Sequence, residues 1–145
     1  MVDLKNLELE DATDEFARKK IEDFYIKCPE KTLKTLVLKI YWKEREEFIA
    51  VVIRGDLRLD LSRLKSELGF VKARFASKEE MQNFGLVIGY VSPIDCSSIK
   101  VIGDKSIIEG KDYYDGGNRL YFYRKNVNYP RDFEVWKLLD VSLKN

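Results

Sequence analysis

Histidine is absent from this chain of 145 residues, and cysteine and proline are scarce, with two and three copies. Without histidine there can be no Ser-His-Asp triad, no Cys-His dyad and almost none of the familiar zinc hydrolase centres. The two cysteines, Cys28 and Cys96, are too few for a disulfide framework or a four-ligand zinc site. We therefore expect no metal and no cofactor, and an ordinary thiol at Cys96, since no imidazole is present to activate it.

Long apolar runs are missing as well, and neither sign of charge dominates. The apolar stretches are far too short to span a bilayer and nothing resembles a signal peptide, so we expect a reduced, cytoplasmic protein with no membrane partner. Lys and Arg number 26 against 25 Asp and Glu, a formal net charge of +1. This balance argues against binding of nucleic acid by counterion release alone, so any such contact would need a local patch or a pocket.

What is present has the composition of one globular domain, with 45% hydrophobic and 35% charged residues. Hydrophobic spacing predicts a helix from Thr13 that ends before Pro29, and residues 35–42 and 48–53 are typical of a β-hairpin. Residues 1–12 are expected to be a lead-in to a domain that covers residues 13–145. The pattern as a whole predicts a mixed α+β fold with more strand than helix.

Further elements are expected from local signals in the rest of the chain. They are a helix over 57–68 that stops at Gly69, a capping box at 77–80 before a short helix, strands at 99–102 and 120–125, and a strand or short helix over 135–141.

Several side chains in the second half of the chain are candidates for chemistry. Asp95, Asp104, Asp115 and Asp132 fall near predicted loops, where a carboxylate can orient a substrate or a water, although most such residues are capping or solvated. The late tyrosines alternate with arginines. This pattern is typical both of a stacking platform for single-stranded nucleic acid and of an exposed sheet face, and both interpretations stay open.

The loop GYVSP, from Gly89 to Pro93, offers chemistry that needs no histidine. Glycine permits close approach of the backbone, and amides in such a loop can hold an ester carbonyl or its oxyanion. The residues alone indicate no more than a mixed α+β domain with a candidate small-ligand site.

Seven short segments occur in an order that is informative as a set. They are residues 30–37 (EKTLKTLV), 51–56 (VVIRGD), 76–80 (ASKEE), 89–93 (GYVSP), 101–104 (VIGD), 116–118 (GGN) and 126–132 (NVNYPRD). Together they resemble the editing domain inserted in bacterial-type prolyl-tRNA synthetases, within the YbaK-type aminoacyl-tRNA deacylase superfamily. The resemblance runs from near Thr13 to about Val141.

The resemblance implies a fold and an activity. The YbaK-type fold would be a strand-rich sheet or partial barrel with a few packed helices. The activity would be hydrolysis of mischarged aminoacyl-tRNA, either Ala-tRNA(Pro) or a similarly small aminoacyl ester, with water as the nucleophile and help from a ribose hydroxyl of the substrate. The implied partners are the acceptor end of the tRNA and a prolyl-tRNA synthetase body, with the chain acting as its editing domain or as a free-standing factor in trans.

The resemblance also assigns catalytic residues. Lys34 matches a lysine that faces the terminal adenosine, where an ammonium suits phosphate or ribose oxygens. Gly89 matches the glycine of the loop that would stabilise the carbonyl. Asp104 matches an aspartate expected to hold the substrate amine or ribose.

Four further residues are implied in substrate binding. Pro93 closes the loop that cradles the aminoacyl group, and Gly117 and Asn118 match the turn before the pocket wall. The family's pocket histidine falls on Tyr123, a bulkier residue that does not titrate near neutrality. That replacement supports an alternative, a catalytically silent domain that binds tRNA ends or amino acids.

Overall fold

The computed structural model describes residues 8–145, and residues 1–7 of the expected lead-in lie outside the described residues. The predicted α+β fold with more strand than helix is confirmed. In chain order the elements are β1 (Glu8–Asp11), α1 (Glu15–Lys27), the 3₁₀ turn η2 (Pro29–Lys31), β2 (Leu33–Tyr41), β3 (Glu46–Arg54), β4 (Leu57–Leu59), α2 (Leu61–Leu68), β5 (Lys72–Phe75), α3 (Lys78–Asn83), the 3₁₀ turn η3 (Pro93–Asp95), β6 (Lys100–Asp104), β7 (Asp112–Gly116), β8 (Phe122–Asn128), β9 (Lys137–Leu139) and β10 (Ser142–Lys144).

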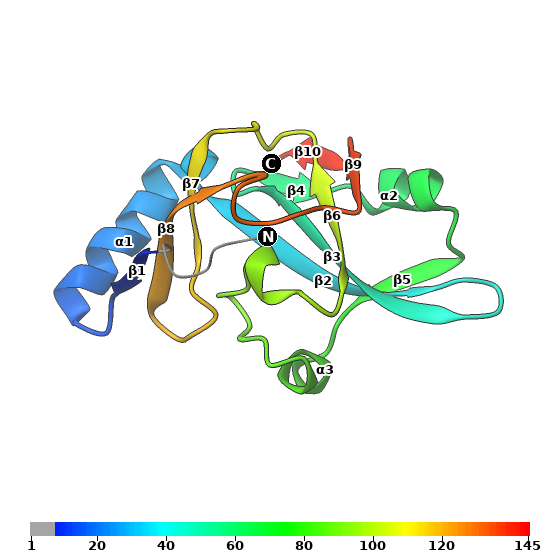
Figure 1. Ribbon diagram of the computed structural model, residues 1–145, viewed down its shortest axis with the longest axis horizontal. Coiled ribbons are helices and arrows are strands. Elements are labelled where there is room, and N and C mark those ends of the chain that lie inside the picture. The colour runs from blue at the N-terminus through cyan, green and yellow to red at the C-terminus, as the bar shows by residue number, and fades with distance from the viewer. Residues whose placement is uncertain (1–7) are drawn as a thin grey trace.

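Three sheets organise these strands (Figure 1). The largest has the order β5-β2-β3-β6-β9, in which β2 pairs antiparallel with β5 and β3 while β6 is parallel to β3 and β9. The antiparallel sheet β1-β8-β7 lies beside α1, and β10 pairs with β4. A bridge between Thr32 and Tyr114 connects the start of β2 to β7. The sheets do not close into a barrel.

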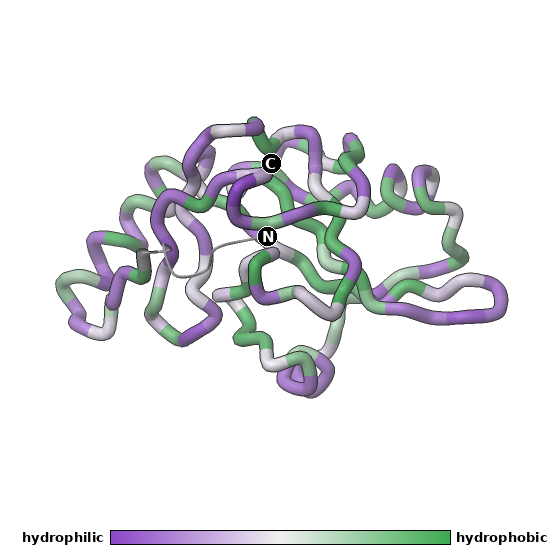
Figure 2. The backbone as a smooth tube through the Cα atoms, in the orientation of Figure 1, coloured by the Kyte–Doolittle hydropathy of each residue, from purple (hydrophilic) through white to green (hydrophobic). Residues whose placement is uncertain are grey.

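The predicted β2–β3 hairpin is the centre of the molecule. Along β3, Ala50 and Val52 pack into one hydrophobic cluster, whereas Ile49, Val51 and Ile53 pack into another. Because successive side chains of a strand point to opposite faces, the continuous apolar run is explained by burial on both sides of the sheet. Figure 2 shows that the far end of the hairpin is largely hydrophilic, in contrast to this centre.

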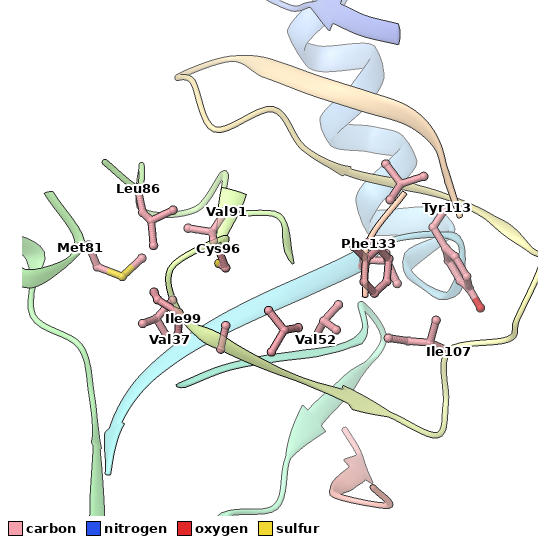
Figure 3. Packing of buried hydrophobic residues seen from close by; sticks show 14 residues of the cluster. Val37, Val52, Met81, Leu86, Val91, Cys96, Ile99, Ile107, Tyr113 and Phe133 are labelled. Atoms are coloured by element: carbon pink, nitrogen blue, oxygen red, sulfur yellow. The ribbon is translucent and has the colours of Figure 1, made fainter. Parts of the chain in front are cut away.

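The first of these clusters forms the floor next to the candidate site. It joins side chains of β2 and β3 to those of α3, the loop after it and β7, as the sticks in Figure 3 show. Val37, Met81 and Val91 belong to this cluster and are almost fully buried. Burial of such side chains contributes about 1.5–3 kcal/mol each, so the strand and the loop are held firmly together.

Two predicted helices are confirmed, and a third is shorter than expected. The helix α1 begins after Asp14, whose carboxylate accepts a hydrogen bond from the N–H of Phe16, and α3 carries the predicted capping box. The expected helix over 57–68 begins only at Leu61, after the N-cap Asp60. Residues 57–59 form β4 instead, because they pair with β10 near the other end of the described chain.

The second half follows its predictions with shifted bounds. The expected strand 120–125 begins at Phe122, since Asn118 and Tyr121 have positive φ angles of 53° and 66° and form a turn. The ambiguity over 135–141 is resolved as the strand β9. Part of the expected lead-in is an element of the fold, because β1 pairs with β8. Within residues 8–145 no helix has the length and apolar character that a membrane span requires.

Candidate functional site

A cavity of about 480 Å³ lies where the first half of β2 meets β7, β8 and the loop after α3. The strand contributes a continuous wall from residue 33 to residue 37, and the loop contributes Ile88, Gly89 and Val91. Much of this wall also belongs to the first hydrophobic cluster. The cavity is therefore an unfilled extension of the core, of a size suited to a small organic group.

Lys34 brings a cation to this largely apolar wall. It lies on β2 opposite Ile53, and its partial burial lowers its pKa, an effect that the charge of Asp56 opposes. Asp56 is itself held by two contacts from the guanidinium of Arg54, at 2.5 and 2.9 Å. Lys34 forms no ion pair within residues 8–145, so its ammonium is available to an anionic or oxygen-rich ligand.

The loop that lines the same cavity as Lys34 turns at Gly89, whose φ of +87° lies in the left-handed region. A side chain at this position would meet no atom within 4 Å, so the glycine is required by its backbone conformation rather than by crowding. In the described part of the chain the N–H of Gly89 donates to no acceptor. It is therefore a main-chain donor free to bind a ligand.

The position of this loop is set by Asn118 and Gly116. The Asn118 side chain accepts from the N–H of Val87 at 2.9 Å and donates to the carbonyl of Gly85 at 2.9 Å. Its own N–H donates to the carbonyl of Tyr90 at 2.8 Å. A Cβ on Gly116 would overlap the backbone of Tyr90, so this glycine allows β7 to approach the loop directly. The loop is consequently clamped on β7.

Tyr123 closes another part of the cavity from β8. Its ring packs against Tyr25 and Tyr90, with centroid distances of 5.4 and 5.6 Å, and only 8% of the residue is exposed. Burial, together with Tyr90, raises the pKa of Tyr123 above its ordinary value. The residue is thus a neutral, bulky wall at neutral pH.

Three buried polar atoms in the wall have no hydrogen-bond partner among the described residues. They are Tyr25 Oη, Thr35 Oγ1 and Asp115 Oδ2, and all three residues line the cavity. Complete burial raises the pKa of Asp115 to about 7, although the Ser92 hydroxyl and the Gly116 N–H favour the ionised form. The wall therefore combines an apolar surface with a small group of unsatisfied acceptors.

The structure brings together three of the seven predicted site residues, namely Lys34, Gly89 and Tyr123. Pro93 is buried in η3 and lines a second cavity of about 560 Å³. Gly117 donates from its N–H to the Phe122 carbonyl in the turn before β8. Neither Gly117 nor its neighbour Asn118 lines the first cavity; both lie in the turn between β7 and β8, next to its walls.

Asp104 lies elsewhere in the fold. It is fully buried at the end of β6, where its carboxylate accepts hydrogen bonds from the N–H groups of Val141 and Ser106 and from the Ser142 hydroxyl. These bonds join β6 to the C-terminal segment. The carboxylate has no access to the cavity, so the expectation that it holds the substrate is corrected by the structure to a structural role.

Sequence reasoning did not place Tyr25 or Thr35 in the site, and it counted Asp115 only as one of four loop carboxylates. A signal for Asp115 exists in the strand pattern. Tyr113 and Asp115 stand two residues apart on β7 and are both almost completely buried, although the pairing of β7 with β8 is irregular between them. An acidic residue at such a position is a candidate for function.

The cavity and its loop can be compared with known proteins. Residues 18–128 match the family model described as "Aminoacyl-tRNA editing domain", which is well over half of the chain. The chain belongs to this family. The matched segment carries most of α1, the strands β5, β2, β3 and β6 of the largest sheet, the Gly89 loop and all of β8.

Relatives with curated names share more of the sequence. The chain is 33% identical over 140 residues to the proline–tRNA ligase of Dehalococcoides mccartyi, a match that covers 97% of this chain and 24% of that protein. It is 34% identical over 122 residues to the proline–tRNA ligase of Thermotoga maritima, covering 83% of this chain and 20% of the ligase. The chain thus spans a quarter or less of the length of these relatives.

Solved structures support the fold. The hypothetical protein APE2540 superposes with a TM-score of 0.71 at 21% identity, covering 95% of this chain and 92% of the other. A candidate trans-editing enzyme for prolyl-tRNA synthetase superposes with a TM-score of 0.64 at 18% identity, covering 83% and 76%. At these identities the likeness shows the arrangement of the elements.

Proposed function

We propose that this editing domain hydrolyses the ester bond of a mischarged aminoacyl-tRNA carrying a small amino acid, with Ala-tRNA(Pro) as the expected substrate. The observation that carries the proposal is the cavity in which Lys34, the Gly89 loop and Tyr123 line one space. Membership of the editing family supports this assignment. The acceptor end of the tRNA, and a prolyl-tRNA synthetase body that delivers it in the cytoplasm, are the partners we propose.

The reaction needs a water, a carbonyl and donors for the charge that develops on it. Water adds to the ester carbonyl carbon, and its proton passes through a ribose hydroxyl of the substrate to the leaving oxygen as the C–O bond to the terminal ribose breaks. The products are the free amino acid and deacylated tRNA. In this scheme the N–H of Gly89 donates to the carbonyl oxygen as it becomes negative, and Lys34 binds phosphate or ribose oxygens; both residues line the cavity.

A protein nucleophile has no part in this scheme. Cys96 is almost fully buried, and burial raises the pKa of its thiol to about 12. Its Sγ–H points to the carbonyl of Ser92. A thiol with this pKa carries almost no thiolate at neutral pH, so water remains the better nucleophile.

In this proposal the size of the cavity selects the amino acid. Tyr123 and its ring neighbours Tyr25 and Tyr90 restrict the cavity on the β8 side. Discrimination against a smaller side chain by binding alone supplies only about 1–3 kcal/mol, which is why a synthetase benefits from a second pocket that excludes the larger, correct amino acid.

The test is deacylation of Ala-tRNA(Pro) by the purified protein, with Pro-tRNA(Pro) as the correct, larger ester. We expect release of alanine above the blank, loss of that release in Lys34→Ala, and retention in Lys39→Ala. Lys39 is a matched control because it lies on the same strand but pairs with Glu46 rather than lining the cavity. Absence of alanine release by the unmodified protein would remove the proposal.

A second candidate function rests on Tyr123, which occupies the position of the family's pocket histidine. On that basis the domain would bind the aminoacylated end without cleaving it. Calorimetry with a non-hydrolysable alanyl-adenosine analogue separates the two. Binding combined with no turnover supports the silent domain, whereas turnover supports the hydrolase.

A further inference from the structure

The three unsatisfied polar atoms of the cavity wall belong to Tyr25, Thr35 and Asp115, which come from three different elements: α1, β2 and β7. A buried acceptor without a partner costs roughly 1–3 kcal/mol, and more when it carries charge. Within residues 8–145 these are the only buried side-chain oxygen or nitrogen atoms left without a partner. The residues that carry these atoms line one cavity, so a ligand group bound there would supply partners that the protein does not.

The neighbours of Asp115 explain why one of its oxygens stays free. Its Oδ1 accepts from the N–H of Gly116 at 2.8 Å, and the nearby Ser92 hydroxyl favours the ionised form of the carboxyl group. Arg124, the nearby cation, is already occupied by a two-bond ion pair with Asp95, at 2.8 Å for each contact, and by the carbonyl of Gly116. The guanidinium therefore lowers the cost of a charge on Asp115 without binding its Oδ2.

Lys34 is not the partner of Asp115 Oδ2 either. The charged group that acts on Lys34 is Asp56, whereas Arg124 and Asp95 act on Asp115. The cation and the buried carboxylate thus have different charged neighbours, although both line the same cavity. A ligand that spans the cavity would meet a cation in one place and an anion in another.

We propose that Asp115, assisted by the hydroxyls of Tyr25 and Thr35, binds the α-ammonium group of the aminoacyl ester. A primary ammonium has three N–H donors and no acceptor, which matches one carboxylate and two hydroxyl acceptors. The inference rests on the proposed function and adds the substrate class: esters with a free, protonated α-amino group. Esters of hydroxy acids or N-blocked amino acids would be poor substrates.

This contact requires an ionised Asp115 carboxylate and a protonated α-amino group, and the two conditions together limit it to a narrow pH range. Complete burial raises the pKa of Asp115 to about 7, opposed by Arg124 and reinforced by Asp95. Tyr25 and Cys96 also face this carboxylate, whose charge helps to raise the pKa of each, so both stay neutral. An α-amino group has an ordinary pKa near 7.7–8.0. The KM for the alanyl ester should therefore be lowest between about pH 7 and pH 8, and this minimum should be absent in Asp115→Asn.

The test compares Ala-tRNA(Pro) with lactyl-tRNA(Pro), in which a hydroxyl replaces the α-amino group. Each kcat/KM is divided by the uncatalysed rate of the same ester, since the ammonium also activates the ester chemically. We expect the protein to prefer the alanyl ester by about 10- to 100-fold, as a charge-assisted contact implies. Asp115→Asn should abolish this preference, whereas Asp140→Asn, at an exposed site outside the cavity, should retain it.

Smaller changes test the hydroxyl acceptors. Thr35→Val, which removes one neutral acceptor, should reduce the preference by about 2- to 10-fold. Thermal unfolding followed by circular dichroism verifies that each variant is folded. An unchanged preference in folded Asp115→Asn, or equal treatment of the two esters by the unmodified protein, would overturn the inference while leaving the hydrolase intact.

Failure of the proposed function gives a different result. If neither ester turns over above the blank, the hydrolase proposal is lost. The ammonium site is then judged by calorimetry with non-hydrolysable alanyl- and lactyl-adenosine amides. Tighter binding of the alanyl compound that depends on Asp115 would support the site, and equal binding would reject it.

Discussion

The buried carboxylate of Asp115 should make the protein less stable as the pH rises through neutrality. Its pKa is about 7 in the folded protein, against 3.8 for an ordinary aspartate. The folded state therefore holds this proton more tightly than the unfolded state, and between these two values the unfolded chain binds fewer protons. By linkage the free energy of unfolding falls with increasing pH in this window, with full stability from this group below pH 3.8.

The magnitude follows from the same two pKa values. A difference of this size corresponds to about 4 kcal/mol in total, of which about 3 kcal/mol is lost between pH 5 and pH 8. In Asp115→Asn the side chain keeps its shape but cannot ionise. The variant should match the unmodified protein near pH 4 and exceed it in stability by about 4 kcal/mol at pH 8.

The assay is urea unfolding of both proteins at several pH values between 4 and 8. Subtracting one curve from the other removes the contributions of the titrating groups that do not interact with Asp115. Parallel pH profiles for the two proteins would refute the reasoning, because they would mean that Asp115 titrates alike in the folded and unfolded states.

Further predictions concern the walls of the cavity. Gly89→Ala should lower the free energy of unfolding by about 1–2 kcal/mol, because a φ of +87° disfavours a residue with a side chain. It should also reduce kcat by about 100-fold or more, because the N–H would turn away from the ester carbonyl, and full activity in a single-turnover assay would contradict this. Asn118→Ala should lower the free energy of unfolding by about 1–3 kcal/mol through loss of its contacts to residues 85 and 87, and an unchanged urea midpoint would count against the clamp. Tyr123→Ala should raise hydrolysis of the prolyl ester relative to the alanyl ester by roughly 10-fold, and a constant ratio would exclude Tyr123 from size selection.

Local signals predicted the fold best where the partners of a segment are near in sequence. The β2–β3 hairpin and the capping box at Ser77 follow from alternation and from residues three positions apart. Residues 57–59 have the same apolar spacing as the helix after them. Their strand pairing depends on residues 142–144, and no local pattern encodes a partner more than eighty residues away.

The site was predictable in part for the same reason. Lys34 and Gly89 lie in short segments on which the resemblance to the family rests, and both line the cavity. Asp104 and Asp115 are both buried at strand ends, and the sequence alone does not reveal which one faces the cavity. That choice is made by tertiary contacts, since backbone and hydroxyl donors satisfy Asp104 and leave one oxygen of Asp115 free.

The pairing of β1 with β8 affects where the domain can be shortened. Glu10 is the register partner of Tyr123, so the first described strand supports the strand that carries the cavity wall. Removal of the residues before Thr13 would take away β1 and expose a row of main-chain donors and acceptors along β8. Exposed sheet edges of this kind recruit other chains, so such a trimmed protein should self-associate and lose the shape of its binding space.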